Sequence, residues 1–274
     1  MNAKQLKNKA NVLRGDVLDV IYKANTGHIG GDYSVIDILT CLYNEVMNIS
    51  PETVNDPDRD RFIMSKGHSV EALYAVLADR GFFSMEEYKN TFSKLGSKFI
   101  GHPNNELPGI EMNTGSLGHG LPVGVGMALA GKLDNRDYRV YVVTGDGELA
   151  EGSLWEAFQS AVHYKLDNLI AIIDRNGLQI SGTTEEVMAS GDMAEKLKTF
   201  GWDVVDVKNG NDTAELLEAF EHCKKKEGKP HVIVAHTTKG SGVSFMENKA
   251  AWHHHVPTEE QYLKAKEELK GQVQ

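Results

Sequence analysis

The chain has 274 residues, of which 41% are hydrophobic and 25% charged, and its formal net charge is −10. This composition is ordinary for a globular protein, and the negative charge argues against a nucleic-acid or anionic-membrane partner. No apolar run reaches membrane-spanning length, and the first residues lack an apolar signal core. The two cysteines, Cys41 and Cys223, stand at no metal-ligand spacing, so we expect buried free thiols and a cytoplasmic protein.

The N-terminal part of the chain predicts a helix followed by a glycine-rich loop. Apolar residues form one stripe over residues 3–26, and Gly27 is available to end the helix. Residues 26–31, TGHIGG, then place His28 among three glycines, where the backbone can come close to a ligand. A helix end with a tight turn explains the same pattern, and this loop alone favours that structural interpretation.

Two further elements precede the least regular part of the chain. Ser34, with a carboxylate three residues later, predicts an N-cap for a helix over residues 35–47. Residues 61–65 form a short apolar run typical of a strand, and His68 follows this run beside a glycine. Taken singly, His68 is again more readily explained as a structural residue than as a catalytic one.

Residues 99–120 show no sustained period and contain His102, His119 and five glycines. A structureless stretch of this length in a compact domain is either a functional loop or disordered. Its aromatic, apolar and His content, without a charge run, favours a binding loop. The loop leads into a predicted helix over residues 117–132, whose small residues suit close packing inside the domain or against another subunit.

The strongest pattern lies in the middle of the chain. A β-branched apolar run at 138–144 predicts a buried strand, which ends in GDGELAEG and is followed by an amphipathic helix over residues 148–164. Asp146 therefore lies between a strand end and a helix start, where α/β proteins bind anions. A second strand, 169–174, ends two residues before Asn176. One carboxylate and one amide oxygen suit a hard cation that also holds a diphosphate.

The remaining elements predict the fold class. Strands at 202–207 and 231–236 bring the expected total to five, and all five alternate with helices. This order predicts an α/β fold with a doubly wound, mainly parallel sheet and helices on both faces, in a single domain over residues 1–274. Four of the five strands end in glycine, His or acidic motifs, and the carboxyl ends of parallel strands meet at one edge.

Three adjacent His residues, 253–255, follow the last strand. They invite a metal interpretation, but neighbouring side chains on extended backbone point to opposite faces. No Asp or Cys accompanies them at ligand spacing. We therefore expect at most one of the three to face the site.

These motifs together resemble the N-terminal, diphosphate-binding half of transketolases, in the form in which the enzyme is divided between two polypeptides. The metal signature is shared by most thiamine diphosphate enzymes, whereas the His contexts are much more specific to transketolase and its relatives. The resemblance covers nearly the whole chain. The matching segments are TGHIGGDYSVIDILTCLY, MSKGHSVEALY, GHP, TGSLGHGLPVGVGMALA, GDGELAEGSLWEA, DRNGLQISGTTEEV and KGSGVSFMENKAAWH.

The resemblance implies a role for each matching position. Asp146 and Asn176 would hold Mg²⁺, with Ca²⁺ or Mn²⁺ as substitutes, and Leu178 would add its carbonyl oxygen. His28, His102 and His253 would line the channel over the thiazolium. Glu151 would join an acidic network that reaches across the subunit interface. The contacts to thiamine diphosphate would come from His68, Leu117, Gly118, Gly147, Glu148, Asn176 and His253.

The resemblance also implies a partner. In full-length relatives the cofactor-activating Glu, the aromatic residue on the pyrimidine and the sugar-phosphate ligands belong to the other half. We therefore expect this chain to be inactive alone and to need a separate C-terminal subunit, most simply as α2β2. The pair would transfer a two-carbon glycolaldehyde unit from a ketose, expected to be phosphorylated, to an aldose, because the thiazolium accepts electrons that water cannot stabilise.

Several alternatives stay open at this point. The metal signature also fits the α subunit of a 2-oxo acid dehydrogenase, a 1-deoxyxylulose-5-phosphate synthase, or a catalytically silent cofactor-binding subunit. His28, His68 and His102 favour transketolase, and a silent copy would be free to lose its metal ligands. His119 stands where many transketolases have Gln. This departure leaves open that the substrate is not a standard pentose phosphate.

Overall fold

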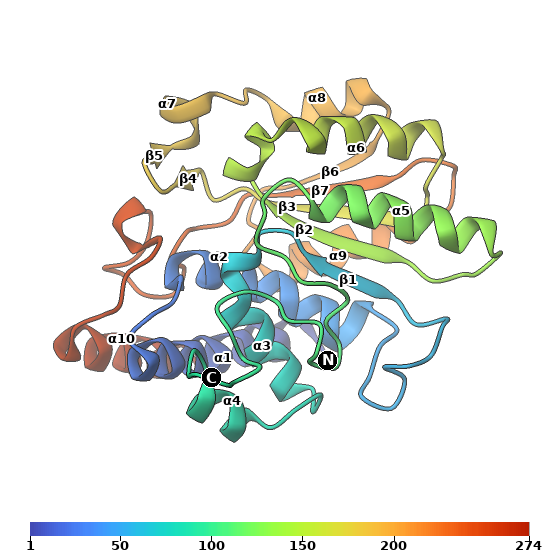
Figure 1. Cartoon of the computed structure of the whole chain (residues 1–274). Helices are drawn as coiled ribbons and strands as arrows, with labels where there is room; N and C mark the ends of the chain where they lie inside the picture. The colour runs from blue at the N-terminus through green and yellow to red at the C-terminus, as the bar shows by residue number, and fades with distance from the viewer. Residues whose placement is uncertain (274) are drawn as a thin grey trace.

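A computed structural model describes residues 1–273, and its centre is a sheet of five parallel strands (Figure 1). The doubly wound, mainly parallel α/β fold is thus confirmed. The strands lie in the order β1-β2-β3-β7-β6. They are β1 (Arg61–Met64), β2 (Val140–Gly145), β3 (Leu169–Asp174), β6 (Asp203–Val207) and β7 (His231–Ala235). A small antiparallel hairpin of β4 (Leu178–Gln179) and β5 (Gly182–Thr183), absent from the sequence-based prediction, lies apart from this sheet.

Helices cover both faces of the sheet (Figure 1). One face carries α5 (Gly120–Leu133), α6 (Gly152–His163) and α8 (Met193–Phe200). The other carries α1 (Ala3–Ala24), α2 (Ile29–Cys41), α3 (Val70–Asp79) and α9 (Thr213–His222), with α4 (Met85–Thr91) and α10 (Glu259–Gln272) packed against α1. The shorter segments are η1 (Leu42–Val46), η2 (Gly67–Ser69), η3 (Gly147–Ala150), α7 (Thr184–Met188) and η4 (Ala250–Trp252). Within residues 1–273 no helix is long and apolar enough to cross a bilayer.

The central strands bury side chains on both faces, which explains their continuous apolar runs. In β2, Val140 and Val142 pack into the core beneath α5 and α6, whereas Tyr141 and Val143 join the core beneath α2 and α3. Every residue of β2 and β3 is buried. The strand ends are consequently the only parts of β2 and β3 that can present side chains to a ligand.

The structure corrects the predicted start of the second helix. α2 begins at Ile29 with His28 at its N-cap, so Ser34 lies inside the helix instead of capping it. The Ser34 hydroxyl instead donates to Asp174 at 2.6 Å, from helix to strand end. Glycines in the first turn disfavour a helix by propensity, but all thirteen residues of α2 are buried, and tertiary packing outweighs that cost.

The structure also corrects the elements around the central motif. The predicted continuous helix over residues 148–164 is divided into the 3₁₀ turn η3 and α6, with extended backbone at Glu151 between them. The helix predicted from residue 117 begins at Gly120. The cause is side-chain bonding: the Asp146 carboxylate accepts from the Gly147 amide and caps the short turn. Both ends of the motif therefore remain in loops at the sheet edge.

Candidate functional site

The carboxyl ends of β2 and β3 open into a cavity of about 390 Å³. Its walls come from the loops after β1, β2, β3 and β7 and from the start of α2. Most of the residues singled out in the sequence thus meet in one place. Those that line the cavity are His28, His68, Leu117, Asp146, Gly147, Glu148, Asn176, Leu178 and His253.

Asp146 is a buried carboxylate at the floor of this cavity. It accepts hydrogen bonds from the backbone amides of Gly147 at 2.8 Å and Gly177 at 2.6 Å. Burial and the nearby charge of Asp174 raise its pKa to about 6. These amides hold the carboxylate in place, but no cationic side chain bonds to it among residues 1–273. A bound divalent cation would offset this burial and lower the pKa.

The donor set around Asp146 fits a hard cation. Asn176 lines the cavity, and its side-chain oxygen also accepts from the amide of Leu178 at 3.1 Å. Within residues 1–273 no three His, Cys, Asp or Glu side chains form a metal-ligating group. A cation here would meet one carboxylate, that of Asp146, and one amide oxygen, that of Asn176. Such all-oxygen sets suit Mg²⁺ or Ca²⁺ and exclude a thiolate or imidazole site.

Three His residues converge on the opposite wall. The ring centroid of His28 lies 5.3 Å from His68 and 5.7 Å from His253. Burial, with the nearby His254, lowers the pKa of His28 to about 3. Burial, with the cation of Lys239, lowers that of His253 to about 4. The imidazoles are therefore neutral at pH 7, and each ring carries one donor and one acceptor nitrogen. Nδ1 of His253 faces the Lys239 ammonium and Nδ1 of His28 is buried, which leaves Nε2 of these rings for a ligand.

Of the His triplet only His253 lines the cavity, as expected, whereas His254 is exposed beside it. The ring of His254 lies 4.6 Å from His28, nearer than that of His253. The expectation assumed extended backbone, whereas residues Ala250–Trp252 form a 3₁₀ turn that continues into a helical conformation at His253. On such a turn adjacent side chains do not point to opposite faces. His255 packs instead against Trp252.

Two buried lysines line the cavity and were not singled out in the sequence. Lys239 is 2% exposed, and its Nζ lies 3.1 Å from Nδ1 of His253. Burial and the charge of Lys66 lower its pKa to about 8. Lys66 forms an ion pair with Asp174 and donates to the carbonyl of Gly31 at 3.1 Å. The glycine-bearing loop KGSG after β7 was the available signal for Lys239, whereas the pairing of Lys66 needs tertiary structure.

Glu148 joins several loops beside the cavity by hydrogen bonds, and Glu151 lies next to one of them at Gly118. The buried Glu148 carboxylate accepts from the amides of Gly118 at 2.9 Å and Gly145 at 3.0 Å, and from the Ser65 hydroxyl. Burial raises its pKa. Gly118 has φ +84°, and a Cβ there would lie 2.6 Å from Cβ of Glu151. Glu148 thus uses its oxygens to hold three loops together, while Glu151 is exposed at the rim.

His102 lies at the mouth of the cavity instead of in its lining. Its ring covers Gly115, where an added Cβ would come within 2.9 Å of the His102 Cδ2. The backbone carbonyl of His102 accepts from the Tyr74 hydroxyl at 2.9 Å, which fixes the loop. His102 is exposed, and the partial burial of its ring lowers its pKa. The structure therefore places His102 within reach of a ligand that fills the mouth.

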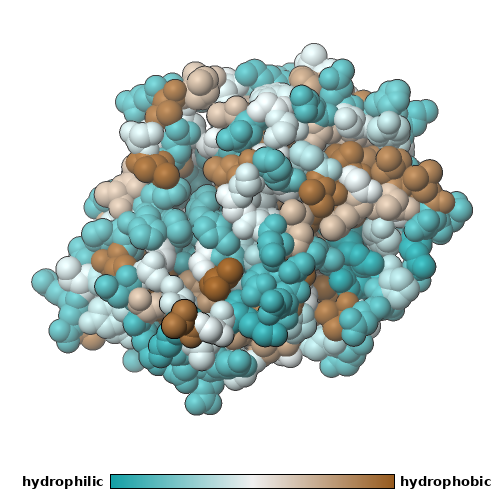
Figure 2. All heavy atoms as spheres, viewed as in Figure 1, coloured by the Kyte–Doolittle hydropathy of each residue, from teal (hydrophilic) through white to brown (hydrophobic). Residues whose placement is uncertain are grey.

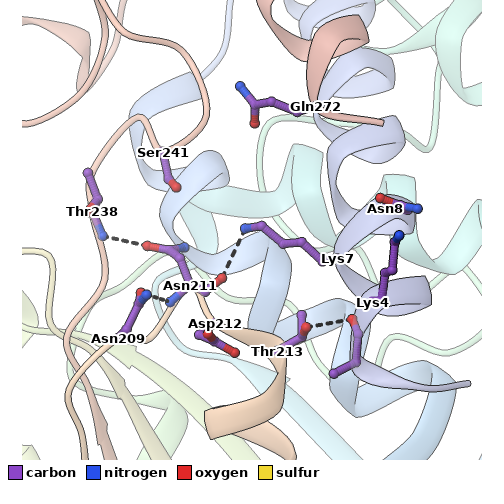
Figure 3. Close-up of a pocket in the computed structure, with 11 residues that line it drawn as sticks. Lys4, Lys7, Asn8, Asn209, Asn211, Asp212, Thr213, Thr238, Ser241 and Gln272 are labelled. Atoms are coloured by element: carbon purple, nitrogen blue, oxygen red, sulfur yellow. Dashed lines mark hydrogen bonds between the residues drawn. The ribbon is translucent and has the colours of Figure 1, made fainter. Parts of the chain in front are cut away.

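A second, larger cavity of about 600 Å³ lies behind the loop that carries Lys239 (Figure 3). The buried Asn211 is its central side chain and accepts from the Thr238 amide at 2.7 Å. Lys7 of α1 donates to the Asn211 carbonyl at 3.0 Å. Figure 3 thus shows Asn211 bonded both to Thr238 and to Lys7, on different sides of the cavity. This network supports the Lys239 loop from its outer side.

The fold and site together define a class. A parallel α/β sheet whose strand ends combine a buried carboxylate, an amide side chain and two buried lysines is typical of proteins that bind a phosphorylated ligand. Comparison with known families gives the particular one. The family described as "Transketolase, thiamine diphosphate binding domain" matches residues 5–272, and the chain belongs to this family. The family predicted from the sequence motifs is thus confirmed.

Individual relatives agree with this assignment. The chain is 50% identical over 274 residues to one of the subunits of the apulose-4-phosphate transketolase of Phocaeicola vulgatus, covering 100% of this chain and 97% of the relative. It is 41% identical over 265 residues to the 6-deoxy-6-sulfo-D-fructose transketolase subunit SqwG of a Clostridium species, covering 96% of each. The solved transketolase of Campylobacter jejuni superposes with a TM-score of 0.93 at 34% identity, over 98% of this chain and 43% of that chain.

Proposed function

We propose that this chain is the diphosphate-binding subunit of a two-subunit transketolase, which transfers a two-carbon ketol unit from a phosphorylated ketose to an aldose. The observation that carries the proposal is the convergence of three neutral His rings on the Asp146 cavity. The length of the match supports the proposal, because this chain matches 97% of the P. vulgatus protein, which is itself named as a subunit. These relatives also favour transketolase over the dehydrogenase, synthase and silent-subunit alternatives.

The cavity fits thiamine diphosphate with Mg²⁺. Asp146, Asn176 and the Leu178 carbonyl would hold the metal, and the Gly147 backbone, with Lys239, would face the diphosphate. When bound, the cofactor supplies an electron sink for breaking a carbon–carbon bond next to a carbonyl. The fit rests on the burial of Asp146 without a paired cation and on Lys239, a buried cation that pairs with no carboxylate among residues 1–273.

The His residues would handle the sugar's protons. His28 and His253 are neutral at pH 7. Because Nδ1 of His253 accepts from the Lys239 ammonium, its Nε2–H would donate to a sugar oxygen that gains negative charge. Nδ1 of His28 is buried, so Nε2 of that ring would meet a sugar hydroxyl. His68 would contact the cofactor from its place between these two rings, and His102 would meet the sugar at the mouth. Burial keeps water from competing for these positions.

A partner subunit would cover the open side of the cavity. Ile180 lines the cavity yet is 75% exposed, and Met188, on the neighbouring α7, is 63% exposed. Figure 2 shows apolar side chains at this hairpin and along α5, where Val123 and Leu133 are exposed. Apolar surface next to a polar site marks an interaction face. We propose an α2β2 assembly, with Glu151 at the rim reaching toward the partner.

We further propose that residues 1–274 act as one domain, that the protein is cytoplasmic, and that its donor is a specialised sugar phosphate. The relatives named for apulose 4-phosphate support this substrate class, because they share 50% and 43% identity with this chain. A standard pentose phosphate is the competing donor.

The test is a donor screen with the assembled enzyme. The chain is purified with its partner subunit, Mg²⁺ and thiamine diphosphate, and ketose formation is followed with apulose 4-phosphate, 6-deoxy-6-sulfofructose and a pentose phosphate ketose. Turnover with at least one donor, lost when either polypeptide is omitted, supports the proposal. The proposal is contradicted if the isolated chain is fully active, or if the two-subunit complex shows no activity with any of the ketoses.

A further inference from the structure

Two carboxyl groups are buried side by side beneath the His cluster. Asp32 lies in the first turn of α2 and Glu71 in the first turn of α3, and both are 0% exposed. Oδ1 of Asp32 accepts from the Ala72 amide at 3.0 Å. Oδ2 of Asp32 and both oxygens of Glu71 have no hydrogen-bond partner within residues 1–273. Three acceptor atoms without donors in one buried place demand an explanation.

The surroundings accommodate one negative charge and not two. The Ala72 amide in the first turn of α3 donates to Asp32, and the Lys66 cation favours the ionised form of Asp32. The other titratable neighbours, Tyr33, Tyr74 and Tyr88, are buried phenols without charge. Burial raises the pKa of Glu71, and the charge of Asp32 raises it further. Two carboxyls in contact in such a place retain one proton between them.

The pair touches the backbone that delivers both His residues. An added Cβ at Gly27 would lie 2.7 Å from Oε1 of Glu71, so this carboxyl sits directly against the segment before His28. The Asp32 amide donates to the His28 carbonyl at 3.1 Å, and the bond to Ala72 joins α2 to the helix that follows His68. His28 Nδ1 is also buried without a partner in the described chain.

We propose that Asp32 and Glu71 share one proton and form a positioning pair, which fixes the first turns of α2 and α3 and thereby sets the spacing between His28 and His68. The shared proton supplies the hydrogen bond that two ionised carboxylates lack. The remaining charge stabilises both helix starts. Neither residue reaches the cavity, so the pair acts through the two His rings and is not itself catalytic.

The shared proton is tested on the full chain by infrared spectroscopy. A protonated carboxyl gives a C=O band distinct from that of a carboxylate. We expect this band in the unaltered chain and its loss in both Asp32→Asn and Glu71→Gln, because each amide replaces the shared hydrogen. The matched control is Asp60→Asn, since Asp60 is also buried but bonds to the Asn48 and Arg139 amides away from the cavity. An unchanged band in both pair variants overturns the shared proton.

The positioning role is tested by kinetics and by NMR of the His side chains. In the two-subunit enzyme, Glu71→Ala should lower kcat about 10- to 100-fold, because small displacements of catalytic groups have effects of this size. Affinity for the cofactor should change less than about threefold, since the proposed metal ligands are untouched. Glu71→Gln should restore most of kcat, because its amide can donate to Asp32.

NMR keeps the test decisive if the Ala variant does not fold. The double variant Asp32→Asn/Glu71→Gln preserves volume but removes the charge, and the His28 and His68 resonances should shift, whereas Asp60→Asn should leave them unchanged. Unaltered resonances in the double variant overturn the positioning role. Only kcat rests on the proposed function: if the complex has no transketolase activity, the infrared and NMR outcomes still decide this inference.

Discussion

Two aspartates at the ends of adjacent strands show how differently the same side chain can be used. Asp174 is the last residue of β3 and accepts from the hydroxyls of Ser34 and Thr237 and from the Lys66 ammonium. Asp146 follows β2 and, within residues 1–273, accepts only from backbone amides of its own and the neighbouring loop. The charge of Asp174 is neutralised by Lys66 inside the protein, whereas the charge of Asp146 faces the cavity without a paired cation among residues 1–273.

This difference separates structure from binding at one sheet edge. A carboxylate with a cation and two hydroxyl donors has little capacity left for a ligand. A carboxylate held by amides is fixed in position but retains its negative charge, as a metal ligand requires. The following predictions would break or sharpen this distinction, from the largest expected effect to the smallest.

Replacing Asp174 by Asn should cause the largest loss, and the loss should be of stability. Lys66 would remain 3% exposed with no opposite charge, and breaking a buried ion pair costs about 3–5 kcal/mol. Denaturant unfolding of the chain measures this change. Adding Lys66→Met should recover part of the lost stability. If Asp174→Asn alone is as stable as the parent, the ion pair of Lys66 and Asp174 does not contribute to stability.

Replacing Asp146 by Ala should leave folding nearly intact but weaken cofactor binding about 100-fold or more, since even outer-shell changes at metal sites cost about 10- to 100-fold. Calorimetric titration of the two-subunit complex with thiamine diphosphate and Mg²⁺ measures the affinity. Asp58→Ala, on the exposed connection before β1, serves as the control. Unchanged affinity would mean that the metal binds elsewhere.

Replacing Lys239 by Met should weaken cofactor binding about tenfold, because a hydrogen bond to a charged group contributes about 1.5–3 kcal/mol. The pKa of Lys239 is lowered to about 8, so the cation is present below pH 8 and lost above it. Affinity of the parent complex should therefore fall as the pH rises from 7 to 9. The cofactor affinity of the Lys239→Met variant should not fall over this pH range. An equal fall in the parent and the variant would exclude Lys239 as the cause of the pH dependence.

The His cluster predicts a smaller effect of pH on stability. His253 has a folded-state pKa of about 4, below the unfolded value of about 6.5. Between these values only the unfolded chain binds the proton, so stability is full above pH 6.5 and decreases as the pH falls toward 4. His253→Asn should make the decrease shallower. Equilibrium unfolding at pH 7 and at pH 4.5 measures the decrease for the parent and the variant. An equal decrease in both proteins would contradict the lowered pKa of His253.

The sequence predicts the strands, and which side chains meet at the strand ends, better than it predicts the contacts that hold those side chains in place. Asp146, Asn176 and His68 follow strand ends, and the geometry of a parallel sheet brings such positions together. Asp174 has no separate signal because it closes an apolar run, and its partners Ser34 and Lys66 come from 140 and 108 residues away. The predicted start of α2 is wrong because the helix propensity of its glycines takes no account of the burial of this segment. Pairings between distant segments leave no local pattern.

The place of β7 in the sheet has a consequence for synthesis. β7 lies between β3 and β6, and β6 pairs with no strand of the sheet except β7. A ribosome-bound chain therefore carries β6 without a neighbour until residue 235 has emerged, and it lacks Lys239 and His253 for longer still. Unpaired strand edges on nascent chains invite aggregation. A cofactor added during translation therefore cannot protect the nascent chain, because the cavity is incomplete until residues 239 and 253 have emerged.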